Sequence, residues 1–423
     1  MGAGVSAART LRVLVIHNRY RSEQPSGEDR VVDQETALLA DAGHRISTFE
    51  RRSDDIADMS LLEKAAVPFR IPWNAAVRSD LAAQLRADRP DVVHIHNTFP
   101  LLSPSVVAAC ADAGVPAVAT LHNYTMVCPT GTLYRGGRVC TDCVRSAPLP
   151  AVRHGCYRGS VPATIPLAVN MVVNRRRWWS EVALFFCISN AQRHILVQAG
   201  MPARRLAVKH NFVVDPDNRR SGPGEYLLYL GRLTDEKGVR QLITAWDQLR
   251  TGGGLGLPLV LAGAGPLHGE LARWAQDRDD VRYLGLQTRA ECAELVARAA
   301  AVVAPSAWLE TFGLVVVEAM AAGVPAVAAA HGAFVELIHD GVTGLLHRPG
   351  DAGSLAECLR RVVASTDTNR KMGRAARHRY EQDFTPSSGL NRLVAGYEAA
   401  IAGSDPCEPL RPPRHGDRTT ADH

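Results

Sequence analysis

The chain has 423 residues, of which 46% are hydrophobic and 22% are charged, a composition typical of a globular protein. It contains no run of about 18 or more apolar residues, so no transmembrane helix is expected. The formal net charge of +5 permits binding of nucleotide phosphates or anionic lipid headgroups but does not require either. At about 150 residues per domain, the length predicts two or three domains.

The N-terminus and the cysteines indicate the compartment. Residues 1–10 lack the long apolar core of a secretory signal and lead directly into a strand. The nine cysteines are an odd number, and without a secretory signal disulfides are not the expected state. We therefore expect a cytoplasmic protein.

Strands and helices alternate through the first half of the chain. Apolar runs predict strands at 11–16, 45–49, 91–96, 116–121 and 182–188. Helical patterns lie between them at 29–42, 78–87, 103–113 and 191–199. This alternation predicts a parallel, doubly wound sheet, whose ligands bind beyond the carboxyl ends of the strands. Three predicted strand ends carry a His-Asn pair: His17-Asn18, His96-Asn97 and His122-Asn123.

A second alternation follows a segment rich in Pro, Gly, Asn and Arg. Strands are expected at 226–231, 259–262, 281–284, 301–304, 326–329 and 341–346. Helices are expected at 238–250, 289–299, 313–323, 352–364 and 390–402. We predict the divisions 1–212 (N-terminal domain), 213–224 (linker), 225–388 (C-terminal domain), 389–402 (a helix packing back toward the N-terminal domain) and 403–423 (a disordered tail). Two such domains form a cleft that suits a two-substrate reaction.

The stretch 302–323 combines a strand, a loop and a helix with two carboxylates, Glu310 and Glu318. Gly313 leaves the helix start unobstructed, so its free N–H groups can hold an anion such as a phosphate. The carboxylates on either side suit the hydroxyl groups of a sugar. Arg232 and Lys237, at another strand end and helix start, are two cations that suit a diphosphate.

These motifs resemble a known family. Residues 231–238 (GRLTDEKG), residues 263–266 (GAGP) and the Glu310–Glu318 pair look like the C-terminal half of family-4 retaining glycosyltransferases of GT-B fold. The N-terminal stretches HNRY…SGED, HIHNTF and LHNY, with the cysteine-rich segment, look like one bacterial branch of that family. The resemblance covers roughly residues 11–400. It implies two Rossmann-like domains facing each other across a cleft, with the acceptor on the N-terminal side.

The resemblance also implies roles for individual residues. Arg232 and Lys237 would bind the donor phosphates and stabilise the leaving nucleoside diphosphate. Glu310 would meet the donor sugar, and Glu318 would hold the ribose hydroxyls. The full set implied to bind the donor is Gly27, Asn211, Gly231, Arg232, Lys237, Gly263, Gly265, Glu310, Phe312, Gly313, Leu314 and Glu318.

The catalytic residues implied by the resemblance are His122, Arg232, Lys237 and Glu310. His122 would contact the donor sugar without acting as an obligatory base. Transfer in the family is described as front-face, with the leaving phosphate taking the acceptor proton. No metal is required for this chemistry, because Arg232 and Lys237 supply the positive charge that Mg²⁺ supplies elsewhere.

Four cysteines form a separate pattern, Cys128-x11-Cys140-x2-Cys143-x12-Cys156, in the insertion 128–156. The central Cys-x2-Cys fits a zinc knuckle, and the outer pair completes four thiolates. A structural Zn²⁺ would explain how a loop-rich segment with few apolar residues folds. A redox pair and simple free thiols are the alternatives, and we do not expect a nucleic-acid-binding finger.

The run 175–179, RRRWW, is both basic and aromatic. It suits peripheral contact with an anionic membrane at the inner face, and the alternative is a solvated helix face with Trp packed beneath it. Altogether we expect a hexosyltransferase-type enzyme with an NDP-sugar donor (UDP- or GDP-type) and an unknown hydroxyl acceptor. It would serve cell-surface glycan, glycolipid or secondary-metabolite biosynthesis. The alternatives are an NDP-sugar epimerase or hydrolase of the same fold and a non-catalytic sugar-nucleotide-binding protein.

Overall fold

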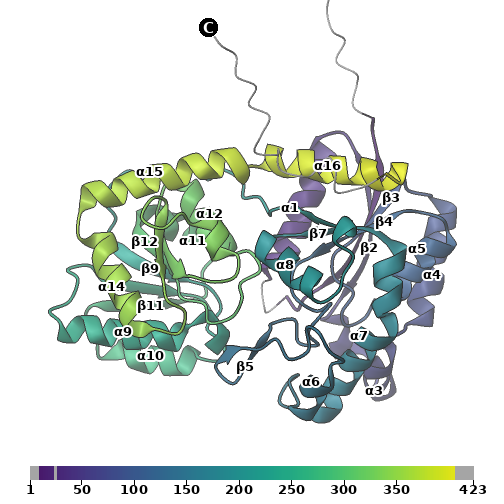
Figure 1. Cartoon of the computed structure of the whole chain (residues 1–423), viewed down its shortest axis with the longest axis horizontal. Helices are drawn as coiled ribbons and strands as arrows, with labels where there is room; N and C mark the ends of the chain where they lie inside the picture. Colours follow the sequence, from purple (N-terminus) through teal and green to yellow (C-terminus); the bar gives the residue numbers. More distant parts are fainter. Residues whose placement is uncertain (1–8, 23–25, 405–423) are drawn as a thin grey trace, which may run out of the picture.

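The computed structural model describes residues 9–22 and 26–404 and consists of two α/β domains side by side (Figure 1). Each domain is built on a six-stranded, all-parallel sheet. The strand orders are β2-β1-β3-β4-β7-β8 and β11-β10-β9-β12-β13-β14. In each sheet the order reverses beside the first strand, and such a switch point is where open α/β sheets bind ligands. The predicted fold of two doubly wound domains is confirmed.

The N-terminal sheet consists of β1 (Arg12–Arg19), β2 (Arg45–Arg52), β3 (Val92–Ile95), β4 (Ala117–Leu121), β7 (Val182–Cys187) and β8 (Leu206–Val208). Its helices are α1 (Gly27–Asp41), α2 (Asp55–Asp58), α3 (Leu61–Arg70), α4 (Ala75–Ala87), α5 (Ser105–Asp112), α6 (Leu149–Arg153), α7 (Val161–Glu181) and α8 (Asn190–Gln198). A two-stranded hairpin, β5 (Tyr134–Arg135) and β6 (Arg138–Val139), lies in the insertion, and the 3-10 turn η1 (Ala203–Arg205) precedes β8.

The C-terminal sheet consists of β9 (Tyr226–Leu230), β10 (Leu259–Ala262), β11 (Val281–Gly285), β12 (Ala299–Ala304), β13 (Ala326–Ala329) and β14 (Gly344–His347). Its helices are η2 (Asp235–Lys237, 3-10), α9 (Val239–Thr251), α10 (His268–Gln276), α11 (Arg289–Arg298), α12 (Leu314–Ala321), α13 (Phe334–Leu337), α14 (Ala352–Val363) and α15 (Thr366–Asp383). The last helix, α16 (Pro386–Ala402), crosses back to the first domain (Figure 1).

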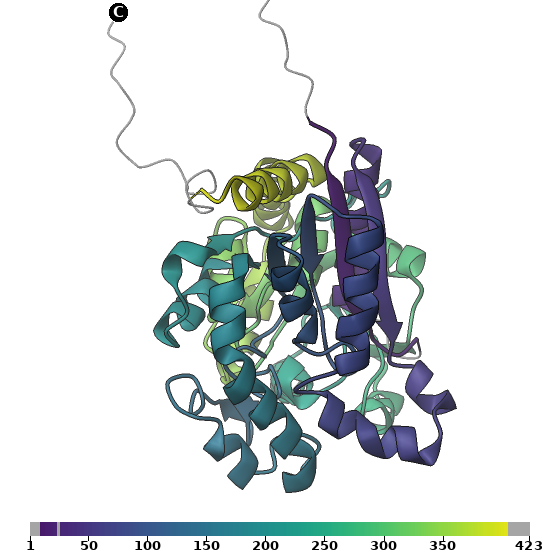
Figure 2. The same cartoon turned by 90° about the vertical axis from the view of Figure 1, so that its right-hand side faces the viewer.

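The inner strands β1, β3, β4 and β7 of the N-terminal sheet are buried on both faces, as near-continuous apolar runs require. On β1, Leu14 and Ile16 join a core cluster with α4, α5 and α7, whereas Val13 and Val15 join a cluster with α1 and α16. Leu393 and Tyr397 of α16 are fully buried in that second cluster. The end of the chain therefore completes the core of the first domain. Figure 2 shows α16 lying across one end of the N-terminal strands.

Several predicted boundaries were wrong. Strand β1 does not end at Ile16 but continues through His17 and Asn18 to Arg19. Helix α1 begins at Gly27 and not at residue 29, because the Ser26 hydroxyl accepts a hydrogen bond from the Glu28 N–H and caps it. Helices α4 and α16 begin at Ala75 and Pro386, three and four residues earlier than expected.

Four helices of nine or more residues were not predicted at all: α3, α7, α10 and α15. In α7 the Pro, Gly and Arg content of the surrounding segment hid a helix of 21 residues. In α15 the polar sequence hid the buried positions Met372, Ala376 and Tyr380, which follow one another at four-residue spacing. Of the predicted tail, residues 405–423 lie outside the described residues. No helix in the described part of the chain is both long enough and apolar enough to cross a bilayer.

Candidate functional site

Two helix N-termini from different domains meet in the cleft. Helix α1 of the first domain begins at Gly27, and α12 of the second begins at Leu314. A Cβ atom placed on Gly27 would lie 3.3 Å from the Leu314 Cδ1 atom. The first N–H groups of a helix lack intrahelical partners, so two helix starts this close to each other favour an anionic ligand nearby.

Glu310 is the best-anchored carboxylate of this region. Its side chain accepts hydrogen bonds from the Lys237 Nζ atom at 2.7 and 3.0 Å, the Ser306 hydroxyl at 3.0 Å and the Trp308 indole N–H at 2.5 Å. Burial raises the pKa of Glu310, but Lys237, Ser306 and Trp308 outweigh burial and hold the pKa below its ordinary value. Glu310 is therefore an ionised and rigid hydrogen-bond acceptor at the carboxyl end of β12.

The structure brings Lys237 to Glu310 and leaves Arg232 exposed. The Lys237 ammonium also lies 5.0 Å from the ring centre of Trp308, a cation–π contact. The Arg232 side chain is 61% exposed, and its guanidinium is 3.6 Å from Glu236. Burial and the nearby Glu28 and Asp29 charges raise the pKa of Tyr20, and the Arg232 charge opposes this rise, so Arg232 lies near the loop that precedes α1. Arg232 thus keeps free N–H donors at the mouth of the cleft.

The glycines predicted to face the donor have a second role that sequence reasoning missed. Gly263 and Gly265 have φ angles of 143° and 156°. A Cβ atom on either would overlap the carbonyl oxygen of Gly231 or of Leu233 in the neighbouring loop. These glycines therefore allow the two loops beyond β9 and β10 to pack against each other. Gly231 provides one side of that contact and lies one residue before Arg232.

Glu318 on α12 forms an ion pair with Arg30 of α1, across the cleft. The sequence gave no reason to select Arg30, because its partner is 288 positions away. Gly313 caps α12 in the left-handed region at φ 96°, and a Cβ atom there would collide with the Phe334 ring. Phe312 is buried and stacks on the His210 ring, 5.9 Å between centroids.

His122 lies against the Glu310 loop from the opposite domain. The Thr311 hydroxyl donates a 3.0 Å hydrogen bond to the His122 carbonyl oxygen. The His122 Nε2 atom is 3.0 Å from the Nδ1 atom of His96, and the two rings are stacked. Burial, followed by nearby His and Lys charges, holds the pKa of each ring well below its usual range, so both imidazoles are neutral.

The strand-end histidines that the sequence analysis noted lie together in the structure. The His17 ring is in edge contact with His96, and the His17 Nε2 atom is 2.6 Å from a carboxylate oxygen of Asp29. Asn211, also predicted to bind the donor, is 3% exposed, and its Oδ1 atom has no hydrogen-bond partner. A buried amide oxygen without a partner is available to a ligand or to ordered water.

Glu28 is a functional candidate that the sequence reasoning did not select. It is the residue after Gly27, and one of its carboxylate oxygens accepts a 3.1 Å hydrogen bond from the Tyr20 hydroxyl. Burial, with a smaller contribution from Asp29, raises the pKa of Glu28 to about 7. A carboxyl group poised near neutrality beside an anion site is an acid–base candidate.

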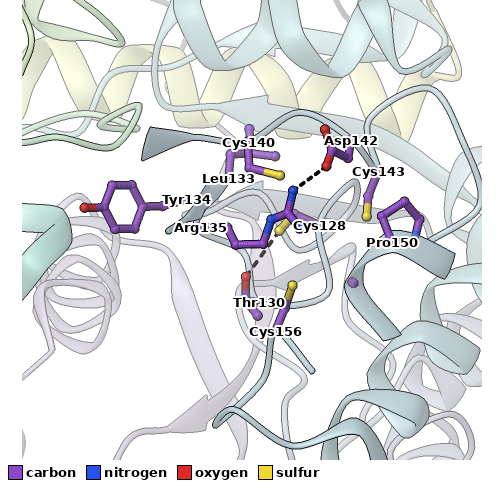
Figure 3. A pocket seen from close by; sticks show the side chains of 11 residues that line it. Cys128, Thr130, Leu133, Tyr134, Arg135, Cys140, Asp142, Cys143, Pro150 and Cys156 are labelled. Carbon is purple, nitrogen blue, oxygen red and sulfur yellow. Dashed lines mark hydrogen bonds and ion pairs between the residues drawn. The ribbon is translucent and has the colours of Figure 1, made fainter. Parts of the chain in front are cut away.

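The four cysteines of the insertion line one small pocket beside the β5–β6 hairpin (Figure 3). All four are free thiols. Arg135 lies among them and pairs with Asp142, and the Thr130 hydroxyl is 3.3 Å from the Cys128 sulfur. Within the described residues, however, only Glu35, His94 and His96 form a group of three whose ligand atoms all lie within 4.8 Å of one another. The sulfurs therefore share a pocket but stand wider apart than ligands around a bound ion.

The basic and aromatic run at 175–179 lies on α7 and is packed. Trp178 is buried in the core. The guanidinium of Arg175 lies 4.2 Å from the Trp179 ring centre, and that of Arg177 lies 4.9 Å from the Trp73 ring centre. The arrangement is that of a solvated helix face with Trp beneath it, the alternative to direct membrane contact.

Comparisons with known proteins agree with this architecture. Residues 25–215 match the Glycosyltransferase Family 4 model, and residues 214–379 match the Glycosyl transferases group 1 model. The glycogen synthase of Mycobacterium tuberculosis is 27% identical over 439 residues, covering 95% of this chain and 98% of that protein. The D-inositol 3-phosphate glycosyltransferase of Mycolicibacterium vanbaalenii is 30% identical over 446 residues, covering 95% and 92%.

Solved structures show the same fold at lower sequence identity. Anabaena HepE in complex with UDP and glucose superposes with a TM-score of 0.66 at 18% identity, covering 92% of this chain and 100% of that chain. Sucrose-phosphate synthase from Thermosynechococcus elongatus superposes with a TM-score of 0.68 at 18% identity, covering 93% and 99%. Together with the two domain models matched in order and a relative 30% identical over nearly its full length, this shows that the chain belongs to the family-4 glycosyltransferases of GT-B fold.

Proposed function

We propose that the protein is a retaining glycosyltransferase that moves a sugar from a nucleoside-diphosphate sugar to an acceptor hydroxyl. The observation that carries the proposal is the anchored Lys237–Glu310 pair, with Arg232 exposed nearby and two helix N-termini converging on the same region. Cationic and backbone N–H groups suit the diphosphate, and the ionised Glu310 suits the sugar hydroxyls. Anabaena HepE, with the same fold, has been solved with UDP and with UDP-glucose, which favours a UDP-type donor over a GDP-type one.

The proposed reaction is a front-face transfer. The bond between the sugar anomeric carbon and the phosphate oxygen breaks, and the acceptor oxygen bonds to the same face of that carbon. The acceptor proton passes to the leaving phosphate oxygen. Arg232 and Lys237 stabilise the charge that develops on the leaving diphosphate, and this kind of preorganised stabilisation is a large part of enzymatic rate enhancement.

Each remaining group has a place in this proposal. We propose that the ribose binds at the Arg30–Glu318 ion pair, that donor binding opens this pair and that Glu318 then accepts hydrogen bonds from the ribose hydroxyls. His122, neutral and adjacent to the Glu310 loop, contacts the donor sugar. Two protein cations at the diphosphate make a divalent metal unnecessary for the chemistry.

The alternatives differ in what they consume and release. An epimerase or hydrolase would turn over the NDP-sugar without an acceptor, and a binding protein would release nothing. A thermal-shift screen of UDP- and GDP-sugars identifies the donor, because a ligand that binds only the folded state raises the melting temperature. Turnover is then followed with candidate acceptors, and NMR of the product reports whether the anomeric configuration is retained. Donor consumption without an acceptor as the main reaction would overturn the proposal.

We propose that the acceptor side faces a membrane, at the inner face. The run at 175–179 is packed, but exposed apolar side chains on α3 and α7 lie close by. They are Leu61, Leu62 and Phe69 on α3, each more than four-fifths exposed, and Ile165, Val169, Val172 and Val173 on α7. Lys64 and Arg70, both exposed on α3, suit anionic headgroups.

We also propose a structural zinc ion for the four cysteines. The pocket offers hydrogen-bond donors to sulfur: the Thr130 hydroxyl to Cys128, the Arg135 guanidinium to Cys140 and the Ala151 N–H to Cys143. Such donors stabilise thiolates, and the Arg135 charge offsets the net negative charge of a zinc ion with four thiolates. Cys128, Cys140, Cys143 and Cys156 would hold the ion, which would fold the insertion and take no part in transfer.

A further inference from the structure

Behind His122 a row of buried polar side chains leads away from the cleft. His122 follows β4, His96 follows β3, Lys209 follows β8 and Glu35 lies on α1. The side chains of His96, Glu35 and Lys209 are at most 2% exposed. Burying three such groups in one place is costly unless they satisfy one another. The transfer mechanism proposed above uses only His122 of the four.

The row consists of two hydrogen-bonded pairs, His122–His96 and Glu35–Lys209, which face each other across 4.0 Å without a hydrogen bond between them. The His122 Nε2 atom is 3.0 Å from the His96 Nδ1 atom. On the other side of the His96 ring, the Nε2 atom is 4.0 Å from the Glu35 Oε2 atom. The other carboxylate oxygen of Glu35, Oε1, is paired with the Lys209 ammonium. Glu35 Oε2 itself is buried and has no hydrogen-bond partner.

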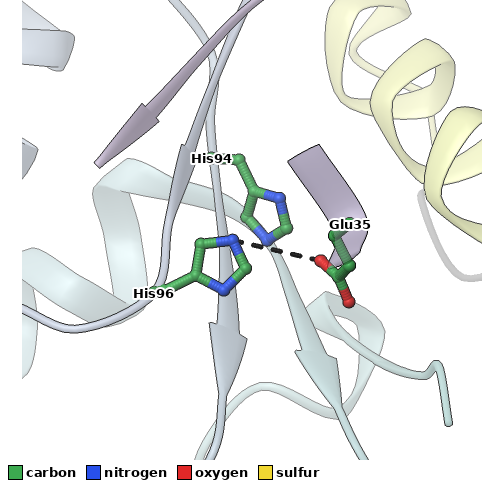
Figure 4. A group of neighbouring side chains, drawn as sticks. All are labelled: Glu35, His94 and His96. Atoms are coloured by element: carbon green, nitrogen blue, oxygen red, sulfur yellow. Dashed lines mark ion pairs between the residues drawn. The ribbon is translucent and has the colours of Figure 1, made fainter. Parts of the chain in front are cut away.

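The same region satisfies the geometric test for a metal site, since Glu35, His94 and His96 point their ligand atoms toward one another (Figure 4). The other hydrogen bonds and ion pairs of these residues argue against a metal site. His94 has both ring nitrogens engaged, Nδ1 at 2.7 Å from the Tyr397 hydroxyl and Nε2 at 2.8 Å from the Thr120 hydroxyl. Glu35 already has a cation on it, Lys209, which would repel a metal ion. The cluster is therefore a buried polar group with its own positive charge, in which the His96 ring faces the free oxygen of Glu35 at 4.0 Å.

Hydrogen-bond donors and acceptors can be assigned along the row, starting from Lys209. A Lys ammonium has three donors and no acceptor, so Glu35 Oε1 accepts, and the ionised carboxylate presents Oε2 as a second acceptor. A ring lone pair opposite Oε2 would be repelled, whereas an N–H dipole is attracted, so the His96 proton belongs on Nε2. His96 Nδ1 must then accept, which requires His122 to donate from its own Nε2. The Nδ1 atom of His122 is left as a hydrogen-bond acceptor.

We propose that Glu35 is a positioning residue that fixes the tautomer of His122 through His96, so that His122 Nδ1 accepts a hydrogen bond from a hydroxyl of the donor sugar. The proposal rests on the proposed function for the identity of the ligand. In this proposal the buried Lys209–Glu35 pair fixes which ring nitrogens of His96 and His122 carry a proton. Neither Lys209 nor Glu35 contacts the substrate itself. The low pKa values of both rings agree with this, because only neutral imidazoles have a tautomer to select.

Glu35→Gln is the informative variant. Lys209 cannot donate to an amide N–H, so the carbonyl of Gln must face Lys209 and its NH₂ group must face His96. The amide then donates to His96 Nε2, and both tautomers invert. His122 would present an N–H to the sugar hydroxyl in place of a lone pair. The matched control is Tyr397→Phe, which removes a hydrogen bond from the adjacent His94 and leaves the row intact.

The test is ¹⁵N NMR of the full chain labelled at the histidine rings, with the His122 signals assigned by their loss in His122→Ala. We expect protonated Nε2 and unprotonated Nδ1 at His122 in the wild type and in Tyr397→Phe, and the reverse in Glu35→Gln. A wild-type His122 that carries its proton on Nδ1 overturns the proposal, even if Glu35→Gln does not fold. This readout needs no turnover, so it stands apart from a failure of the proposed function.

A double-mutant cycle then tests the consequence for the sugar. Glu35→Gln should lower kcat/KM on the order of tenfold, as loss of one hydrogen bond predicts. In the His122→Ala background the same substitution should have no further effect, because there is no tautomer left to set. An equal loss in both backgrounds would show that Glu35 serves stability alone and would overturn the positioning role.

Discussion

Lys237 donates to both carboxylate oxygens of Glu310, at 2.7 and 3.0 Å, and thereby joins the turn before α9 to the loop before α12. From the sequence we expected Lys237 to bind the donor diphosphate and Glu310 to bind the donor sugar. Their pairing means that the acceptor atoms for the sugar are oriented by one of the cations meant for the phosphate. Under the proposed function, this pair would couple the binding of the donor sugar to the binding of the donor diphosphate.

The Lys237→Ala and Arg232→Ala variants should differ in their free energy of unfolding. Either substitution to Ala should lower the transfer rate on the order of 10²-fold, as for loss of one charge-stabilising donor. Only Lys237→Ala leaves the buried Glu310 without its cation, so it alone should also lower the free energy of unfolding, by about 3 kcal/mol. Urea denaturation and steady-state kinetics on both variants measure this. Near-wild-type turnover in both would remove the donor-site assignment.

Glu28 should make stability depend on pH. Because burial raises its native pKa to about 7, the native state binds a proton that the unfolded state has already lost above pH about 4.5. Its contribution is therefore greatest at low pH, and the free energy of unfolding falls as pH rises toward 7. Glu28→Gln should flatten this slope, by on the order of 1 kcal/mol between pH 5 and about 7.5. Parallel slopes for variant and wild type in urea titrations would contradict it.

Transfer should not depend on a divalent cation. With protein that is already folded, brief treatment with EDTA should leave the rate within about twofold of its starting value, because Arg232 and Lys237 carry the charge. Adding Mg²⁺ afterwards should change little. Activity that disappears with EDTA and returns with Mg²⁺ would contradict the metal-independent mechanism.

The four-cysteine pocket should hold about one zinc ion per chain. Metal analysis of purified protein measures this directly, and the pair Cys140→Ser and Cys143→Ser should abolish the bound zinc. Cys292→Ser, in a thiol far from the pocket, is the control and should retain it. Fully folded wild-type protein without zinc, or with Cys140 and Cys143 oxidised to each other, would favour the thiol or redox alternatives.

The apolar side chains of α3 should anchor the protein to anionic vesicles. Leu61→Glu with Leu62→Glu places two charges on an exposed surface, so the fold should be unaffected while sedimentation with vesicles containing phosphatidylglycerol falls by tenfold or more. The control pair, Val335→Glu and Val342→Glu, changes exposed apolar residues of the C-terminal domain. Equal vesicle binding by both double variants would contradict the proposed surface.

The sequence by itself determined the fold class and the family. Long apolar runs such as 11–16 and 301–304 become strands because both faces of a parallel sheet are buried, and that pattern is local. The loop motifs around Arg232, Glu310 and Glu318 are also local. Their chemistry could be predicted without knowing which residues face them in the folded protein.

Only the tertiary structure determines which charged residues pair with one another. Arg30 reaches Glu318 from 288 positions away, and Lys209 reaches Glu35 from 174 positions away. Neither pair leaves a periodic signal, because each depends on how two elements pack and not on the spacing within one. Helix α15 was not predicted for a related reason. Its few apolar side chains stabilise the helix only by packing against residues that are distant in the sequence. Sequence pattern therefore specified the elements and the chemistry that each loop could offer, and packing specified which of those groups act together.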